Sequence, residues 1–175
     1  MEKSYKQILP QIDTFIFDVD GVLTNGTVTI FPDGQLIRQM NVKDGFAIKA
    51  AIKAGYKICV ITGGKNENVR TRLTNLGIKD IYLSAYNKEE QYIDYVTKYD
   101  LNPENILYMG DDIPDYKVMK LVGMPCCPND ASREIQQISK YISDKTGGNG
   151  CVRDIIEQVL RVQDKWNANF DTEHN

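Results

Sequence analysis

An apolar run that ends in two carboxylates is the feature that most constrains this chain. Phe15, Ile16 and Phe17 precede Asp18 and Asp20, which are separated by a single residue. Successive side chains of a strand point to opposite faces, so the two acids can converge on one small volume where the chain leaves a sheet. Two anions that close repel each other unless a cation lies between them, and Mg²⁺ with a phosphate is the favoured candidate. The run therefore predicts a buried strand with phosphoryl chemistry at its end.

The composition favours one domain that binds neither nucleic acid nor an acidic membrane. A chain of 175 residues is long enough for one substantial core. Its 21 basic and 24 acidic residues give a net charge of −3, and the two signs are mixed along the sequence. No apolar run approaches the roughly 20 residues needed to cross a bilayer, and the first residues lack the apolar region of a signal peptide. We therefore expect a cytoplasmic protein.

The cysteines and the single histidine add no obvious chemistry. Cys59, Cys126, Cys127 and Cys151 show no Cys-x-x-Cys spacing and no neighbouring histidine. A zinc site or a disulfide framework is therefore disfavoured, and we expect reduced thiols in the core. His174 lies in a polar tail, so a mechanism that needs a histidine base has little support.

Strand-like and helix-like segments alternate along the chain. Strands are expected near 15–17, 57–62, 81–84, 106–109, 124–127 and 141–143. Helices are expected over about 44–54 with Asp44 as the cap, and over 66–76, 88–99, 115–121, from 132, and over 152–166. This alternation predicts an α/β fold, with a doubly wound, mostly parallel sheet and right-handed crossovers. Residues 1–167 are expected to form the single domain, and residues 168–175 a disordered tail.

A turn signal interrupts the alternation near the start. Pro32, Asp33 and Gly34 lie between the strand-like runs 28–31 and 36–40, which indicates a protruding β-hairpin over about 27–40.

Polar groups recur where the apolar strands end. Ligands of doubly wound sheets bind beyond the carboxyl ends of the strands. Each residue taken alone is explained as a helix cap or a turn residue, but the ordered set favours a site. Its members are Asp18, Asp20, Thr62, Lys88, Asp111, Asp112 and Asp115.

These residues can fill the roles that phosphoryl transfer requires, namely nucleophile, proton donor and donors to the phosphoryl oxygens. Asp18 is the expected nucleophile. Asp20 would protonate the leaving alcohol and then deprotonate the water that hydrolyses the aspartyl-phosphate. Thr62 and Lys88 would hold the phosphoryl oxygens.

The remaining acids suit a magnesium ion. Asp18, Asp111 and the backbone carbonyl of Asp20 are the expected ligands, while Asp112 and Asp115 would support the metal from the outer shell.

The order and spacing of these residues resemble the haloacid dehalogenase superfamily of aspartate-nucleophile phosphatases. The matching motifs are Asp18 to Thr24, Thr62-Gly63, Lys88, and Gly110 to Asp115. The resemblance extends from about residue 14 to residue 166. It implies a Rossmann-like core and a magnesium-dependent phosphatase that forms an aspartyl-phosphate.

A finer resemblance concerns the absence of a cap domain. The segments between Asp18 and Thr62 and between Thr62 and Lys88 are too short to hold one. Within the capless branch, residues 41–45, 68–72, 110–112 and 147–153 resemble the 3-deoxy-D-manno-octulosonate 8-phosphate phosphatases of lipopolysaccharide precursor synthesis and their nononate 9-phosphate relatives. That branch implies a homotetramer in which a neighbour's hairpin covers the active site. The alternative is a solvated hairpin on a monomer.

A sugar-acid phosphate also carries a carboxylate, which a guanidinium group binds through paired hydrogen bonds. Arg72 is the first candidate and a solvated helix arginine is its alternative, while Lys65 and Arg70 are weaker candidates beside Gly63 and Gly64. The nononate phosphatases carry glutamate at the position of Gly64, and octulosonate phosphatases commonly carry arginine. The missing glutamate favours the octulosonate, while 2-keto-3-deoxy-nononate 9-phosphate and acylneuraminate 9-phosphate stay open as substrates.

Two non-enzymatic hypotheses remain. A receiver domain also places acids, a threonine and a lysine around magnesium, but its phosphoacceptor would stand alone on a middle strand. The pair Asp18 and Asp20 on the first strand favours turnover instead. A catalytically silent scaffold is the other alternative, and catalytic release of phosphate from an aryl phosphate discriminates against both.

Overall fold

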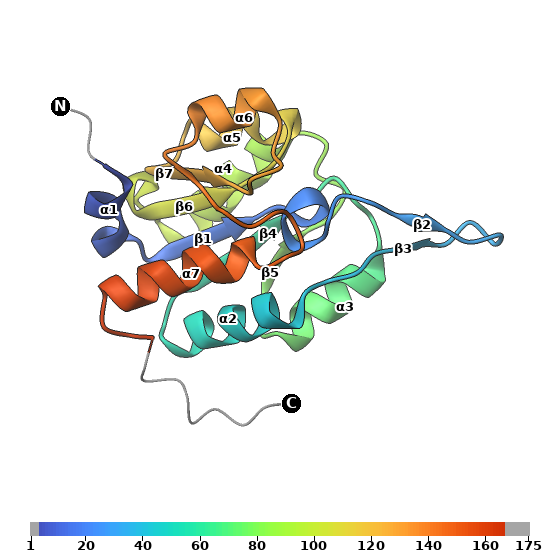
Figure 1. Ribbon diagram of the computed structural model, residues 1–175, viewed down its shortest axis with the longest axis horizontal. Helices are drawn as coiled ribbons and strands as arrows, with labels where there is room; N and C mark the ends of the chain where they lie inside the picture. The colour runs from blue at the N-terminus through green and yellow to red at the C-terminus, as the bar shows by residue number, and fades with distance from the viewer. Residues whose placement is uncertain (1–3, 167–175) are drawn as a thin grey trace.

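A six-stranded sheet in the order β5-β4-β1-β6-β7-β8 forms the centre of the protein in a computed structural model (Figure 1). The structure describes residues 4–166. Every pairing in this sheet is parallel. The strands are β1 (Thr14–Phe17), β4 (Lys57–Ile61), β5 (Asp80–Tyr82), β6 (Ile106–Met109), β7 (Met124–Cys127) and β8 (Tyr141–Ile142). The predicted doubly wound α/β fold is confirmed.

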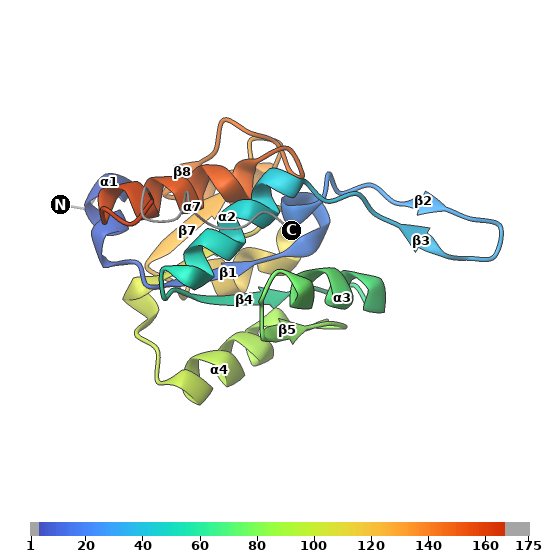
Figure 2. The same cartoon turned by 90° about the horizontal axis from the view of Figure 1, so that it is seen from below.

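Helices cover both faces of the sheet, as Figure 2 shows from below. They are α1 (Tyr5–Ile8), α2 (Val42–Lys53), α3 (Glu67–Asn75), α4 (Lys88–Tyr99), α5 (Tyr116–Met119), α6 (Arg133–Ile138) and α7 (Cys151–Val162). The side chains of α2, α3 and α7 join one core cluster, and those of α4, α5 and α6 join the other.

The central strand β1 shows how the sequence builds these two cores. Phe15 and Phe17 pack into the cluster under α2 and α7, while Ile16 between them packs into the cluster under α4. All three side chains are fully buried. Alternate residues of a strand face opposite sides, so a strand covered on both faces must be apolar throughout. The polar residue that follows, Asp18, therefore stands out.

Strand order locates the binding edge of the sheet. After β1 the chain adds β4 and β5 on one side, and it then crosses to add β6, β7 and β8 on the other. The carboxyl ends of β1 and β6 flank this reversal, which is where doubly wound sheets bind ligands.

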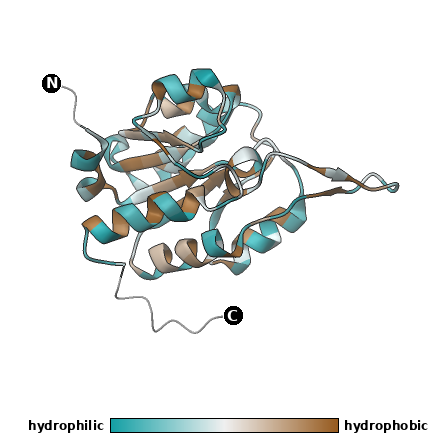
Figure 3. Cartoon of the chain, in the orientation of Figure 1, coloured by the Kyte–Doolittle hydropathy of each residue, from teal (hydrophilic) through white to brown (hydrophobic). Residues whose placement is uncertain are grey.

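The hairpin lies outside the sheet and projects from it (Figure 1). Strands β2 (Thr29–Ile30) and β3 (Leu36–Ile37) pair antiparallel, so the predicted hairpin is present with a shorter paired segment. Figure 3 shows apolar residues on these strands. The exposed apolar side chains are Val28, Ile30, Phe31, Leu36 and Ile37. Between β1 and β4 the chain otherwise forms a short turn and α2, which leaves no cap domain there.

The structure corrects the start of α2. Asn41, not Asp44, caps this helix, because its side chain accepts a hydrogen bond of 2.8 Å from the backbone N–H of Lys43. Asp44 is buried in the first turn and accepts a hydrogen bond of 2.8 Å from the backbone N–H of Arg153 in α7. The acid therefore caps a helix that is remote in sequence.

Other boundaries differ by a few residues. Helix α7 ends at Val162, short of the predicted 166. Helix α5 begins at Tyr116, directly after a 3₁₀ turn over Ile113–Asp115. Helix α1 was not predicted. The four cysteines are buried and unbridged, as expected. The predicted disordered tail 168–175 and His174 lie outside the described residues.

Candidate active site

The predicted strand-end residues meet in one cleft of about 410 Å³. Asp18 follows β1, Thr62 follows β4, and Asp111 follows β6 by two residues. These three strands are neighbours in the sheet, so their ends bring the side chains together. The cleft is lined by Asp18, Asp20, Gly26, Thr62, Gly63, Gly64, Ala85, Tyr86, Lys88, Asp111, Asp112, Pro114 and Asp115. Every predicted catalytic and metal-site residue is therefore on its wall.

The turn after β1 presents its two acids through a tight backbone path. The N–H of Thr24 donates to the carbonyl of Val19 at 3.0 Å and closes the turn over Val19–Leu23. Gly21 has a φ of +88°, and a Cβ at this position would lie 1.9 Å from Oδ2 of Asp111. Only glycine allows this approach.

Lys88 bridges two buried acids. Its Nζ lies 3.0 Å from Oδ1 of Asp18 and 2.7 Å from Oδ1 of Asp115. The hydroxyl of Tyr108 donates to the same Asp115 oxygen at 2.6 Å, and the backbone N–H of Asp111 donates to the other at 3.2 Å. Asp115 is thus held from three sides, and it fixes both the lysine and the loop that carries Asp111.

The electrostatics of this cluster follow from its burial. Desolvation raises the pKa of Asp18, and the negative charge of Asp115 raises it further, while Lys88 opposes both. Desolvation and then Asp115 raise the pKa of Asp111 to about 7. Burial by itself would lower the pKa of Lys88, but its two acidic neighbours outweigh that effect and raise it. The lysine therefore stays charged, and one ammonium faces an excess of carboxylates.

That excess fits a divalent cation. Asp18, Asp111 and Asp115 each place a carboxylate oxygen within 4.8 Å of the others. Hard oxygen donors of this kind suit Mg²⁺. Because Lys88, Tyr108 and a backbone N–H engage both oxygens of Asp115, Asp18 and Asp111 are the better placed ligands.

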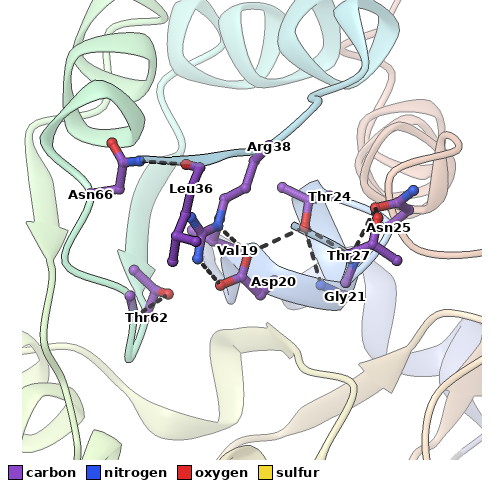
Figure 4. Close-up of polar contacts among 12 residues, drawn as sticks. Val19, Asp20, Gly21, Thr24, Asn25, Thr27, Leu36, Arg38, Thr62 and Asn66 are labelled. Atoms are coloured by element: carbon purple, nitrogen blue, oxygen red, sulfur yellow. Dashed lines mark hydrogen bonds and ion pairs between the residues drawn. The ribbon is translucent and has the colours of Figure 1, made fainter. Parts of the chain in front are cut away.

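The general acid candidate has a partner that the sequence did not reveal. Arg38, one residue after β3, places Nε 2.6 Å from Oδ1 of Asp20 and Nη2 3.0 Å from Oδ2 (Figure 4). Hydrogen bonding to Asp20 raises the pKa of Arg38. No motif or spacing in the sequence indicated this contact. The buried Tyr108 was also missed, although a tyrosine inside an apolar strand is a signal for a polar partner.

The candidate substrate-binding residues fall into two groups, since the two glycines line the cleft and the charged residues lie outside it. Arg72 lines a groove of about 680 Å³ between the hairpin and α3, together with Arg38 and Asn66. Arg70 donates to the carboxylate of Glu67 at 2.9 Å and to the carbonyl of Ile81 at 3.0 Å. Its guanidinium group is therefore engaged in contacts within the protein. Lys65 is exposed and lines neither cavity, whereas Gly63 and Gly64 line the cleft.

The fold and this site define a haloacid dehalogenase-like hydrolase, and the family model of that description matches residues 77–155. The chain belongs, within that class, to the family of 3-deoxy-D-manno-octulosonate 8-phosphate phosphatases. It is 34% identical to the enzyme of that name, KdsC, from Escherichia coli strain K12 over 154 residues, which cover 88% of this chain and 82% of the relative. That membership makes the chain a phosphoric monoester hydrolase.

Solved structures agree with the assignment. The phosphatase of the same name from Yersinia pestis superposes with a TM-score of 0.90 at 30% identity, covering 93% of this chain and 88% of that one. The enzyme from Moraxella catarrhalis, crystallised with a magnesium ion, a phosphate ion and a KDO molecule, gives a TM-score of 0.90 at 30% identity, with 93% and 94% covered.

Proposed function

We propose that this protein is a magnesium-dependent phosphatase that hydrolyses 3-deoxy-D-manno-octulosonate 8-phosphate to the free sugar acid and phosphate. The observation that carries the proposal is the buried contact of 3.0 Å between Lys88 and Asp18 at the floor of the cleft, with Asp20 and Thr62 on its wall. A relative of 30% identity contains magnesium, phosphate and the sugar acid together.

In the first half of the reaction, a carboxylate oxygen of Asp18 attacks phosphorus. The bond from phosphorus to the sugar oxygen breaks, its electron pair stays on that oxygen, and Asp20 gives it a proton. The hydroxyl of Thr62 and the ammonium of Lys88 donate hydrogen bonds to the phosphoryl oxygens and offset their growing charge.

In the second half, Asp20 is a carboxylate and takes a proton from water. The water oxygen attacks phosphorus, the bond to Asp18 breaks, and the electron pair returns to the aspartate as phosphate leaves. Asp115 keeps Lys88 in place throughout, because the pair is buried and joined at 2.7 Å.

Magnesium, when bound, neutralises part of the substrate's negative charge. Asp18, Asp111 and the backbone carbonyl of Asp20 would hold it. Asp112 and Asp115 would orient these ligands from outside, as the hydrogen bond from the Asp111 N–H to Asp115 supports.

Recognition of the sugar acid is assigned to the groove beside the cleft. Arg72 is its first candidate for the carboxylate, while Lys65 and Arg70 are weaker because neither faces this groove. Gly63 and Gly64 would line the path of the substrate. The alternatives are the nine-carbon substrates 2-keto-3-deoxy-nononate 9-phosphate and acylneuraminate 9-phosphate. They stay open because residue 64 is glycine and not the arginine that is common in octulosonate phosphatases.

The assembly proposed is a homotetramer in which the hairpin of one copy covers the cleft of another. The exposed apolar side chains of the hairpin support it, since a monomer leaves them in water. No helix among residues 4–166 is long and apolar enough to cross a membrane. We place the enzyme in the cytoplasm, at the step that supplies the sugar acid for lipopolysaccharide.

The direct test compares kcat/KM for the eight-carbon and nine-carbon keto-sugar phosphates with Mg²⁺ and with EDTA. We expect at least a ~10-fold preference for the eight-carbon ester, because sugar contacts outside the phosphate differ. The reverse preference would assign the nononate function. A single stable phosphorylation without release of phosphate would instead favour a receiver-like domain.

A further inference from the structure

We infer that Arg38 is a positioning residue for Asp20 and that the root of the hairpin thereby controls protonation of the leaving group. This inference rests on the proposed phosphatase activity. It concerns a contact between two residues 18 positions apart, one in the turn after β1 and one at the end of the hairpin.

The geometry of the contact is that of a clamp. The guanidinium binds both oxygens of Asp20, at 2.6 Å and 3.0 Å, in a fork that fixes the plane of the carboxylate. The Arg38 side chain is only 11% exposed, whereas that of Asp20 is 36% exposed and lines the cleft. Oδ2 of Asp20 accepts only the hydrogen bond from Arg38 among those of the described residues, so it retains a second lone pair. The acid can therefore still face the substrate while the arginine holds it.

The other restraint on Asp20 is weak. The hydroxyl of Thr24 donates to its Oδ1 at 3.4 Å, near the limit for a hydrogen bond. Without Arg38, the carboxyl group would rotate more freely. A proton donor out of line with the leaving oxygen loses most of its catalytic effect.

The hairpin root is itself anchored beside the clamp. The side-chain amide of Asn66 donates to the carbonyl of Leu36 at 3.0 Å, which ties β3 to the loop before α3 (Figure 4). Arg38 follows two residues later. Any displacement of the hairpin root would move the guanidinium that holds Asp20.

Gly64 leaves the room that the clamp needs. A Cβ on this residue would lie 3.6 Å from Oδ2 of Asp20 and 3.8 Å from Nη2 of Arg38. A methyl group would be in ordinary contact, but a longer side chain directed there would compete with the guanidinium. A longer side chain at position 64 would therefore disturb the same contact that Arg38 makes with Asp20.

The test uses two aryl esters that differ in their need for protonation. Phenyl phosphate has a poor leaving group and p-nitrophenyl phosphate a good one. With Mg²⁺ present, Arg38→Ala should lower kcat/KM for phenyl phosphate at least ~30-fold, within the range of general acid catalysis, and for p-nitrophenyl phosphate less than ~3-fold. KM should stay unchanged for both, and Arg38→Lys should restore part of the loss. Arg161→Ala, which removes an exposed arginine from the far end of α7, is the matched control.

A second variant checks the role of Gly64. Gly64→Leu should reproduce the leaving-group dependence, and the double variant with Arg38→Ala should lose little more than either single one. Equal losses with both esters, a raised KM as the only change, or additive effects would overturn the inference. Wild-type protein inactive on both esters would remove the phosphatase function and the inference with it.

Discussion

Two regions of the protein depart from the usual pattern, in which charged side chains are exposed and apolar ones are buried. The first is the cluster of Asp18, Lys88 and Asp115, and the second is the hairpin. The cluster buries three charged side chains, each less than 10% exposed, under the ends of the strands. The hairpin exposes apolar side chains, with Ile30 at 72% and Ile37 at 44%. Buried charge requires partners, and exposed apolar surface favours a cover.

The difference lies in where the partners come from. One chain supplies every partner of the cluster, because Lys88 contacts both acids and Tyr108 and a backbone N–H complete the set. Nothing in the described chain covers the outer part of the hairpin. The partners of the chemical centre therefore all come from one copy, whereas the cover that we propose for the cleft would come from another copy.

The largest expected effect is on chemistry. Asp18→Asn removes the attacking oxygen, and we expect kcat to fall at least ~1,000-fold in a phosphate-release assay. Circular dichroism and the melting temperature should stay near those of the wild type, because asparagine fills the same space. Turnover within ~10-fold of wild type would remove Asp18 from the nucleophile role.

The next largest effect is on the stability of the folded protein, through the buried cluster. Lys88→Met leaves Asp18 and Asp115 facing each other without a cation, so the free energy of unfolding should fall by about 3–5 kcal/mol in urea titrations. The control is Lys98→Met, whose lysine is 52% exposed and pairs with Asp80 at 2.7 Å. That surface pair should contribute much less, because water and salt screen it. Equal losses would show that the cluster is not sustained by its lysine.

Substitutions in the hairpin should weaken assembly of the oligomer and leave the stability of the fold nearly unchanged. Ile30→Asp with Ile37→Asp places charge on its apolar strands, and we expect the apparent dissociation constant of the oligomer to rise at least ~100-fold by light scattering. The unfolding free energy should change by less than ~1 kcal/mol. Ile93→Asp, at a site 53% exposed on α4, is the control. A monomeric wild type would contradict the proposed cover.

The smallest effect concerns a buried acid that lacks a lysine. Desolvation raises the pKa of Asp44 from 3.8 to about 6, against the hydrogen bonds that it accepts from α7. Between these values the folded state binds more protons than the unfolded state, so stability falls as pH rises from about 4 to 6, by at most about 3 kcal/mol. Asp44→Asn should flatten this slope in urea titrations at several pH values. An unchanged slope would assign it to other groups.

The sequence predicted the fold and the residues that line the cleft, because both depend on local patterns. Apolar strands that end in polar residues identify a parallel sheet, and parallel strands bring their ends to one edge. Asp18, Asp20, Thr62, Lys88 and Asp111 were found in this way. The helix boundaries were predicted less accurately, because caps such as Asn41 of α2 compete with nearby residues of similar chemistry.

The sequence by itself determined the reaction class, because the spacing of the acids at strand ends already implies a shared edge. Only the tertiary structure decided that Arg38 clamps Asp20, that Tyr108 supports Asp115 and that Asp44 caps α7. The physical reason is that these contacts join residues from different elements. Their partners are set by how the hairpin, α2 and α7 pack, and no periodicity along the chain records that packing.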